Sequence, residues 1–404
     1  MWAERLNRTR PIRRRPIPRP RFPLLPVLTW GTFAGNRAAR TANVTDVGTG
    51  IAVSSGTAAI ALALQHAGVG PGDRVLVPAF HCGSMIEPAL ARSAVPVYYR
   101  IHRDTSVDLD DIRAKLADSP RVLLVAHYFG FPQDMPGLRA FCDRHGLLLI
   151  EDCAHAFFGS CGDRPVGWYG DYAVASVRKF FPTCDGGFLT SSRLSVKDIP
   201  LKSGGLVFNL KATLDIFEEA VSFGRLKPFN YAFALPNVLK KRIWGWVKSM
   251  RRHGAPVIPG AENPQAYRYL DVRQVNRRMS TPSKLILRMA ARSRIIRRRR
   301  ANYLRLAQGL SGLAHGRPLR PELPGEVVPY MFPFLIDNPE IYFPRLKQQG
   351  IPIFRWEDLY STDCATSTDY ASRLLQLPCH QDLRTAELDW MIECIVDTLG
   401  HRQP

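Results

Sequence analysis

The chain has 404 residues, enough for one large domain and a smaller one, and its 46% apolar and 22% charged residues are typical of a globular protein. No apolar run reaches the roughly 18 residues of a membrane-spanning helix, so no membrane span is expected. The formal net charge of +20 would suit phosphorylated substrates, an anionic membrane or nucleic acid; we expect a solvated basic surface and no nucleic-acid partner.

Residues 1–40 form the first predicted unit, a basic N-terminal arm rich in Arg and Pro. Prolines spaced through it prevent a regular helix, so we expect an extended arm that packs only in part, through residues such as Phe22 and Trp30. The arm lacks the continuous apolar region of a secretory signal, and the eight cysteines of the chain are scattered without a CxxC pair. Both features favour a cytoplasmic protein with reduced thiols.

Residues 41–280 are expected to form a large α/β domain. Short apolar runs predict strands at RVLVPAF, VPVYY, RVLLVAHYF, LLLIED, YAVASV and GFLTSS, and helical stretches are predicted at Ser84–Arg92, Leu109–Ala117 and Met135–His145. Continuous apolar strands that alternate with helices predict a mostly parallel sheet covered on both faces. Ligands of such sheets gather beyond the carboxyl ends of the strands, where His81, His127 and Asp152 stand.

The segment IAVSSGTAAIALALQHAGV predicts a strand, a turn of small residues and a helix that begins near Thr57. Ser55, Gly56 and Thr57 would place hydroxyls and free backbone N–H groups at the helix N-terminus, which suits a phosphate group. The same residues also fit an ordinary helix N-cap, and the motif alone does not separate the two interpretations.

The stretch from Leu147 to Gly187 carries the most specific chemistry. The strand LLLIED delivers the carboxylate of Asp152, and Lys179 follows about one strand later in the apolar setting SVRKFF, ahead of a glycine pair. A pyridoxal 5'-phosphate site requires such an acid and such an amine, because a lysine holds the cofactor as a Schiff base and a carboxylate keeps its ring nitrogen protonated. The plainer alternatives are a surface lysine and a helix-capping or ion-paired aspartate.

The rest of the chain is less specific. Residues 192–265 give a poor signal, and the piece KKRIWGWVKSMRR within them fits either an amphipathic helix on a membrane surface or a helix that covers the sheet or contacts a second subunit. Residues 281–404 are predicted to hold an Arg-rich linker helix within Ser283–Leu310 and a small C-terminal α+β domain. That domain has predicted strands at YMFPFLI and GIPIFRW and predicted helices at IYFPRLKQQ and ELDWMIECIVDTL.

Several motifs occur in one order along the chain: SSGTAAIALAL, GVGPGDRVLVPAF, AHYFG, IEDCAHAFFGS and the lysine ahead of Gly186-Gly187. Together they resemble the DegT/DnrJ/StrS-type sugar aminotransferases, which are pyridoxal phosphate enzymes of fold type I. The resemblance covers residues 45–190 well and residues 330–398 moderately, where GIPIFRW and LPCHQDL carry it. It implies a large, mixed but mostly parallel sheet domain, a small α+β domain, and a homodimer with its sites at the subunit interface.

By this resemblance, Lys179 is the catalytic residue, which would hold the cofactor and move a proton between the substrate carbon and the cofactor. Asp152 would pair with the ring nitrogen, and His155 would lie near the cofactor's O3′ or its ring face, although a core histidine is the plainer interpretation. The other expected cofactor-binding residues would hold the phosphate: Ser55, Gly56, Thr57 and Ser176, with Asn276 reaching the phosphate of the neighbouring subunit. No metal ligand is expected.

Three positions depart from the family's pattern. Ser176 lies three residues before the lysine, whereas many members have this serine five residues before it, and Asn276 belongs to an NRRM segment that matches only loosely. Cys82 stands where the family has Phe or Trp stacked on the cofactor ring. Phe80 or His81 would then have to cover the ring, or the ring is covered less.

A lysine at this position, in place of the histidine of the family's dehydrating branch, favours transamination. We expect an amino acid such as L-glutamate to supply an amino group to a keto sugar, most simply a nucleotide-activated one used in polysaccharide or glycoconjugate biosynthesis, although a cyclitol or a lipid-linked sugar also fits. Two alternatives stay open: a pyridoxal phosphate enzyme of another class, such as a lyase or dehydratase, and a non-catalytic basic scaffold that retains the fold.

Overall fold

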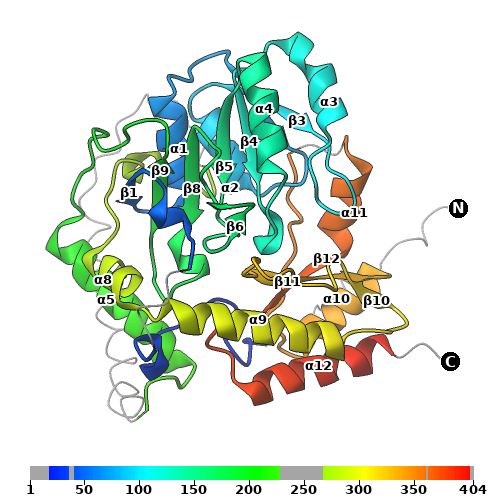
Figure 1. Ribbon diagram of the computed structural model, residues 1–404. Helices are drawn as coiled ribbons and strands as arrows, with labels where there is room; N and C mark the ends of the chain where they lie inside the picture. The colour runs from blue at the N-terminus through cyan, green and yellow to red at the C-terminus, as the bar shows by residue number, and fades with distance from the viewer. Residues whose placement is uncertain (1–17, 36–40, 228–266, 361–362, 401–404) are drawn as a thin grey trace, which may run out of the picture.

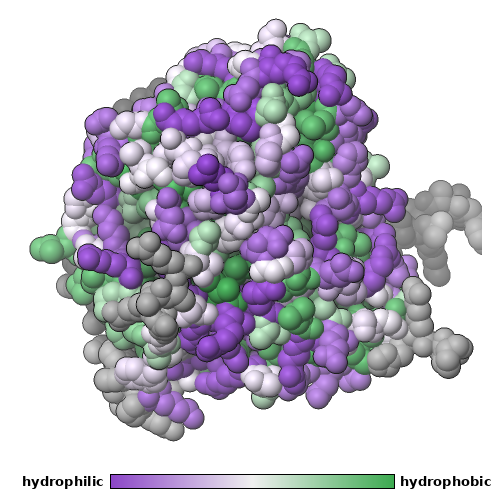
Figure 2. Space-filling model, viewed as in Figure 1, coloured by the Kyte–Doolittle hydropathy of each residue, from purple (hydrophilic) through white to green (hydrophobic). Residues whose placement is uncertain are grey.

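The computed structural model describes residues 18–35, 41–227, 267–360 and 363–400. The first 17 residues of the basic arm and the KKRIWGWVKSMRR piece lie outside the described residues. Within the described ranges, no helix combines the length and the apolar character that crossing a membrane requires. Hydrophilic side chains are spread over the face shown in Figure 2 and are not confined to one patch.

The centre of the fold is a seven-stranded sheet in the order β1-β9-β8-β5-β4-β2-β3 (Figure 1). Strands β3, β2, β4, β5 and β8 pair in parallel, whereas β9 runs antiparallel to both β8 and β1. The sheet is therefore mixed and mostly parallel, which confirms the predicted fold class. Its strands are β1 (Thr49–Val53), β2 (Arg74–Pro78), β3 (Val95–Tyr99), β4 (Val122–Ala126), β5 (Leu148–Asp152), β8 (Tyr172–Ser176) and β9 (Gly187–Ser191).

Burial explains why the apolar runs became strands. Every residue of β4 and of β8 is buried, as expected for strands covered on both faces. The helices of this part are α1 (Gly56–His66), α2 (Gly83–Leu90), α3 (Leu109–Ala114), α4 (Met135–His145) and α5 (Gly205–Ser222), and a short hairpin is formed by β6 (Ser160–Cys161) and β7 (Arg164–Pro165). The three predicted helices are confirmed; the second ends early, before the 3-10 turn Lys115–Asp118.

The ends of α4 show how the sequence sets a helix boundary. The Asp134 side chain accepts a hydrogen bond from the Gly137 N–H, which satisfies a donor of the first turn. Gly146 ends the helix at φ 65°, a left-handed conformation that costs glycine little. These two residues fix α4 between the carboxyl end of β4 and the start of β5.

A second, antiparallel sheet in the order β10-β11-β12 forms the C-terminal α+β part. The strand predicted at YMFPFLI is β11, and both predicted helices are present. The strand predicted at GIPIFRW is wrong: only Phe354 bridges Gln376 there, because Pro352 offers no N–H to a ladder. The elements of this part are β10 (Gly316–Pro318), β11 (Met331–Ile336), α10 (Pro339–Gln348), α11 (Ala365–Arg373), β12 (Leu374–Pro378) and α12 (Thr385–Leu399).

The predicted linker helix is two helices, α8 (Thr281–Met289) and α9 (Arg292–Gly309). They separate at Ala290, whose ψ of 141° is extended, and the N–H of Ala291 bonds the carbonyl of Thr32. α9 crosses the molecule below the large sheet and packs against α12 (Figure 1). The hydrogen bond to Thr32 of the N-terminal segment therefore stabilises the extended residues between α8 and α9, where the sequence pattern predicted one continuous helix.

Residues 18–35 of the predicted arm are packed against the C-terminal part. Phe22 is buried and meets the ring of Trp390 edge-on at 5.9 Å, and the Arg21 guanidinium lies 4.4 Å from the centre of that ring. The His380 imidazole donates a hydrogen bond to the carbonyl of Pro23 at 2.9 Å. The division into units at residues 40 and 280 stays a prediction.

Candidate active site

A cavity of about 660 Å³ opens where β5 and β8 end and α1 begins. The C-terminal part closes its other side with Tyr330 and residues 354–358. Seven of the eight residues predicted from the sequence line this cavity: Ser55, Gly56, Thr57, Asp152, His155, Ser176 and Lys179. The carboxyl ends of the parallel strands therefore bring together residues that are up to 124 positions apart, from 55 to 179.

Lys179 ends the 3-10 turn Val177–Lys179 that follows β8. Its Nζ lies 5.3 Å from the centre of the Tyr330 ring and forms no hydrogen bond or ion pair with the described residues. Burial lowers the pKa of this amine, and Arg178 adds to the effect, whereas Cys82 and Asp152 oppose it. An amine with a lowered pKa spends more time uncharged near neutral pH and can then act as a nucleophile or base.

Asp152 is the last residue of β5 and is almost fully buried. Its Oδ1 accepts a hydrogen bond from the Ala154 N–H at 2.8 Å. Burial raises the pKa of this carboxyl, and Lys179, the Ala154 N–H and His127 act in the opposite direction. If the protonated ring nitrogen of a bound pyridoxal phosphate lay against Asp152, its positive charge would offset the effect of burial on the pKa and favour the ionised carboxylate.

The start of α1 is packed closely against the turn between β8 and β9. Ser55 caps the helix, and its Oγ accepts the Ala58 N–H at 3.0 Å. A Cβ on Gly56 would lie 3.3 Å from the Cβ of Ser176, and a Cβ on Gly187 would lie 2.1 Å from the carbonyl oxygen of Ser55. The missing side chains let the first-turn N–H groups, which have no intrahelical partners, and the hydroxyls of Ser176 and Thr57 face one cavity.

Aromatic rings surround His155 on the cavity wall. Its ring centre lies 4.3 Å from that of Tyr330 and 5.4 Å from that of Trp356. The Phe129 N–H donates to its Nδ1, and burial together with Lys179 holds the pKa of His155 well below its usual value, so the ring is neutral. The sequence reasoning missed Tyr330 and Trp356 as site residues, although Trp356 ends the GIPIFRW motif that carried part of the resemblance.

The segment after β2 contributes only one of its three candidates to the cavity. Cys82 lines the cavity, with its Sγ 2.7 Å from the Ser84 hydroxyl. Phe80 packs on Trp356 outside the cavity lining, with ring centres 4.9 Å apart. His81 is buried, bonded to the Pro78 carbonyl and to the N–H of Tyr360. Of the two alternatives offered for this position, cover by Phe80 or His81 is therefore excluded for this cavity, whose aromatic wall consists of His155, Tyr330 and Trp356.

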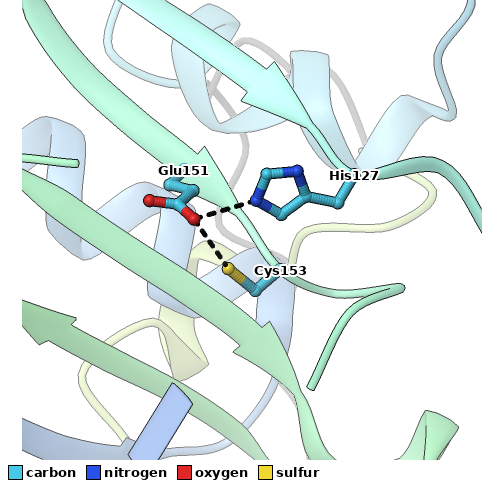
Figure 3. Close-up of side chains that lie close together, drawn as sticks. All are labelled: His127, Glu151 and Cys153. Atoms are coloured by element: carbon cyan, nitrogen blue, oxygen red, sulfur yellow. Dashed lines mark hydrogen bonds and ion pairs between the residues drawn. The ribbon is translucent and has the colours of Figure 1, made fainter. Parts of the chain in front are cut away.

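Three polar residues are predicted at strand ends, His81, His127 and Asp152, and only Asp152 lines the cavity. His127, like His81, is buried in the core, where it lies beside Glu151 and Cys153 (Figure 3). Since the Gln133 N–H donates to Nδ1 of His127, its Nε2 carries the proton and donates to Glu151 at 2.9 Å.

Glu151 is satisfied by hydrogen bonds on both oxygens. Besides His127, it accepts three backbone N–H groups, those of Gly167, Tyr169 and Gly170, at 2.6 to 3.2 Å. The cluster thus ties β5, which delivers Asp152, to the loop before β8.

Asn276 does not line the cavity. Its carbonyl accepts the Lys202 N–H at 2.7 Å, and its side-chain Oδ1 is buried without a hydrogen-bond partner among the described residues. Its predicted contact with a neighbouring subunit stays a prediction.

Charged side chains surround the mouth of the cavity. Arg178 is exposed, Arg268 pairs with Asp358 at 2.5 Å, and Arg355 pairs with Glu357 at 2.6 Å. The interior groups, an amine, a buried carboxylate, hydroxyls and a helix N-terminus, form the donor set that pyridoxal phosphate needs.

Comparisons with known proteins agree with this geometry. The model of the DegT/DnrJ/EryC1/StrS aminotransferase family matches residues 28–201. The chain is 34% identical over 161 residues to UDP-N-acetyl-3-dehydro-alpha-D-glucosamine 3-aminotransferase of Acidithiobacillus ferrooxidans, covering 38% of this chain and 43% of that protein. It is 35% identical over 244 residues to L-glutamine:scyllo-inosose aminotransferase of Streptomyces griseus, covering 54% of this chain and 58% of that protein. The chain spans about half the length of the curated relatives it matches.

Among solved structures, S. venezuelae DesV in complex with a ketimine intermediate superimposes with a TM-score of 0.60 at 20% identity. The superposition covers 89% of this chain and 88% of that chain. The fold expected from the motifs is thus confirmed over most of the chain, and the sequence resemblance is confirmed over residues 28–201.

Proposed function

We propose that this chain, whose residues 28–201 match the model of the DegT/DnrJ/EryC1/StrS aminotransferase family, is a pyridoxal phosphate-dependent aminotransferase that delivers an amino group to a keto sugar. The observation that carries the proposal is the convergence of Lys179, Asp152 and the start of α1 on one cavity of about 660 Å³. No pair of these features defines such a site, but an amine, a buried acid and a phosphate cradle together do.

Each of the seven predicted residues that line the cavity has surroundings that support its proposed role. When bound, pyridoxal phosphate supplies a carbonyl that amines attack and a ring that withdraws electrons from the reacting carbon. Asp152 would hold the proton on the ring nitrogen, and Ser55, Gly56, Thr57 and Ser176 would hold the phosphate.

Lys179 would hold the cofactor and carry the proton to and from the substrate. Its lowered pKa supports this role, because a general base works best when its pKa is near the operating pH. His155, Tyr330 and Trp356 form an aromatic wall that would exclude water from the reacting carbon.

A keto sugar is proposed as the acceptor because the names of the relatives refer to amination of a keto sugar or of a cyclitol ketone. The arginines at the mouth, with Arg178 unpaired by any described carboxylate, favour an anionic, nucleotide-activated sugar. L-Glutamate is the proposed amino donor; the names of several relatives point to L-glutamine, which the same assay compares. The product would enter polysaccharide or glycoconjugate biosynthesis.

We further propose a cytoplasmic homodimer. The cysteines are all free, which suits a reducing compartment. Asn276 belongs to this proposal, since its Oδ1, which has no hydrogen-bond partner within the described ranges, is a candidate for a contact with a second subunit. Sedimentation of the purified chain tests the dimer.

Reconstitution with pyridoxal phosphate tests the function. The wild type should become yellow and should lose that colour in a single turnover with L-glutamate or L-glutamine, whereas Lys179→Ala should bind the cofactor weakly and do neither. Colour that persists with both donors would favour a lyase or dehydratase. A wild type that binds the cofactor no better than Lys179→Ala would favour the non-catalytic scaffold.

A further inference from the structure

Arg299 is an arginine on α9 without a direct ion pair in the described part of the chain, although the carboxylate of Asp382 is near enough to favour its charged form. Its side chain is fully buried, although it belongs to the basic run Arg297–Arg300 whose first member is exposed. Among the described residues, no Asp or Glu forms an ion pair with it. A buried cation is costly unless its donors are satisfied, so the partners of this guanidinium indicate why it is there.

Four hydrogen bonds engage the guanidinium of Arg299, which has five N–H donors. Nη2 donates to the carbonyl of Lys179 at 2.7 Å, and Nη1 donates to the carbonyls of Pro329 and Tyr330, both at 3.0 Å. Nε donates to Oε1 of Gln381 at 2.9 Å. Three of the four acceptors are backbone carbonyls, which do not move unless the chain itself moves.

The same network reaches the residue after the lysine. Gln381 donates its Nε2 hydrogen to the carbonyl of Phe180 at 2.8 Å, and the Arg299 guanidinium lies 4.4 Å from the centre of the Phe180 ring. The carbonyls of two consecutive residues, Lys179 and Phe180, are thus fixed by one cluster on the side away from the cavity.

Lys179 and Tyr330 come from different parts of the fold, one after β8 and the other just before β11, and both side chains line the cavity. The planar guanidinium bonds both of their carbonyls and so sets the separation of the two chain segments. The amine of Lys179 stands 5.3 Å from the centre of the Tyr330 ring across this joint. Lysine at 299 would keep the charge but not the fork geometry that reaches four acceptors.

We propose that Arg299 is a positioning residue for the reaction: it holds the backbone of Lys179 and of Tyr330 so that the lysine amine points into the cavity at a fixed distance from the opposite wall. The inference rests on the proposed function for its catalytic consequence, but its structural consequence can be measured without turnover. Burial lowers the pKa of Arg299 to about 10, which leaves the group charged at neutral pH.

The test compares Arg299→Lys and Arg299→Gln with Arg297→Gln, which changes an exposed arginine on the same helix. We expect both Arg299 variants to lose about 100-fold in kcat while the KM values of donor and acceptor stay within about threefold, because misplacing the lysine affects the chemical step more than binding. The control should behave as the wild type. An Arg299→Lys enzyme with kcat within about threefold of the wild type overturns the proposal.

Hydrogen exchange of the cofactor-free protein provides a second readout. The amides of Phe180 and Phe181 bond the carbonyl of Val177, so loosening the turn should speed their exchange by about tenfold in Arg299→Lys but not in Arg297→Gln. Unchanged exchange overturns the proposal, whatever the activity. If the wild type lacks aminotransferase activity, the proposed function fails, and this measurement still decides whether Arg299 holds the turn.

If the Arg299 variants do not fold, Gln381→Leu replaces them, since it removes the bond to the Phe180 carbonyl and the acceptor of Arg299 Nε but leaves the three carbonyl acceptors of the guanidinium in place. We expect a loss of about tenfold in kcat and faster exchange of the same amides. Wild-type values for both quantities in this variant would also overturn the proposal.

Discussion

Gly187 lies where β9 begins, pressed against the first residues of α1. A Cβ at this position would stand 2.1 Å from the carbonyl oxygen of Ser55, 2.2 Å from its carbonyl carbon and 2.6 Å from the backbone nitrogen of Gly56. All three atoms belong to the backbone, so no side-chain rotation relieves the clash. In Gly187→Ala, either β9 or the start of α1 must move until the closest contact reaches the 3.4 Å of an ordinary contact.

The expected cost follows from that displacement. Overpacking of this kind costs about 3 kcal/mol, and the unfolding entropy of about 2.1 cal/mol/K per residue gives roughly 0.8 kcal/mol/K for a chain of this length. The Tm of Gly187→Ala should therefore fall by about 4 °C. Because the shift also moves the N–H groups proposed to bind the cofactor phosphate, the Kd for pyridoxal phosphate should rise at least about tenfold, the equivalent of one hydrogen bond.

Differential scanning calorimetry and fluorescence titration with the cofactor measure the two effects. The matched control is Gly70→Ala, since a Cβ on Gly70 would meet no atom within 4 Å; its stability should stay within about 0.5 kcal/mol of the wild type. A Gly187→Ala protein with an unchanged Tm would refute the steric reasoning. A lowered Tm with an unchanged Kd would refute the assignment of the α1 start as the phosphate site.

Three further predictions concern the buried polar groups. Glu151→Gln would turn an amide NH2 toward backbone N–H donors, so urea unfolding should report a loss of about 1–3 kcal/mol in the free energy of unfolding. The control is Glu326→Gln, which changes an exposed glutamate and should leave the free energy of unfolding unchanged. Equal urea midpoints for the two variants would contradict the hydrogen-bond network of Glu151. Burial lowers the pKa of Lys179 in the folded protein below the unfolded-state pKa of about 10.4. In the pH range between these two pKa values the unfolded chain binds more protons than the folded protein, so the stability of the cofactor-free protein rises with pH. Lys179→Met should remove this slope and stabilise the cofactor-free protein at neutral pH, and a slope that persists in the variant would show that another group causes it. Burial lowers the pKa of His380 to about 3, so the contribution of this neutral imidazole to stability is lost as pH falls from about 6.5 toward 3. In His380→Gln, the free energy of unfolding should therefore fall less steeply over this acidic range than in the wild type. Identical slopes for the two proteins would contradict a buried neutral imidazole.

The pattern of apolar runs predicted most of the large sheet correctly, because strands covered on both faces must be apolar throughout, as β4 and β8 are. It also placed Asp152 and Lys179 at strand ends and Ser55 at a helix start, since local sequence sets these boundaries. The same pattern could not distinguish polar residues that reach the cavity from those that do not. His81 and His127 also follow strands, yet both turn into the core, where backbone groups and Glu151 satisfy them.

The sequence by itself determined the fold class and the chemical groups of the candidate site: a helix N-terminus of small residues, an acid and an amine in a fixed order along the chain. Only the tertiary structure decided what surrounds them. Tyr330 and Trp356 reach the cavity from the second sheet's side, and Arg299 reaches the carbonyl of Lys179 across 120 positions of sequence. Such contacts depend on how two parts of the chain pack, and no local pattern in a run of arginines reveals which one will be buried.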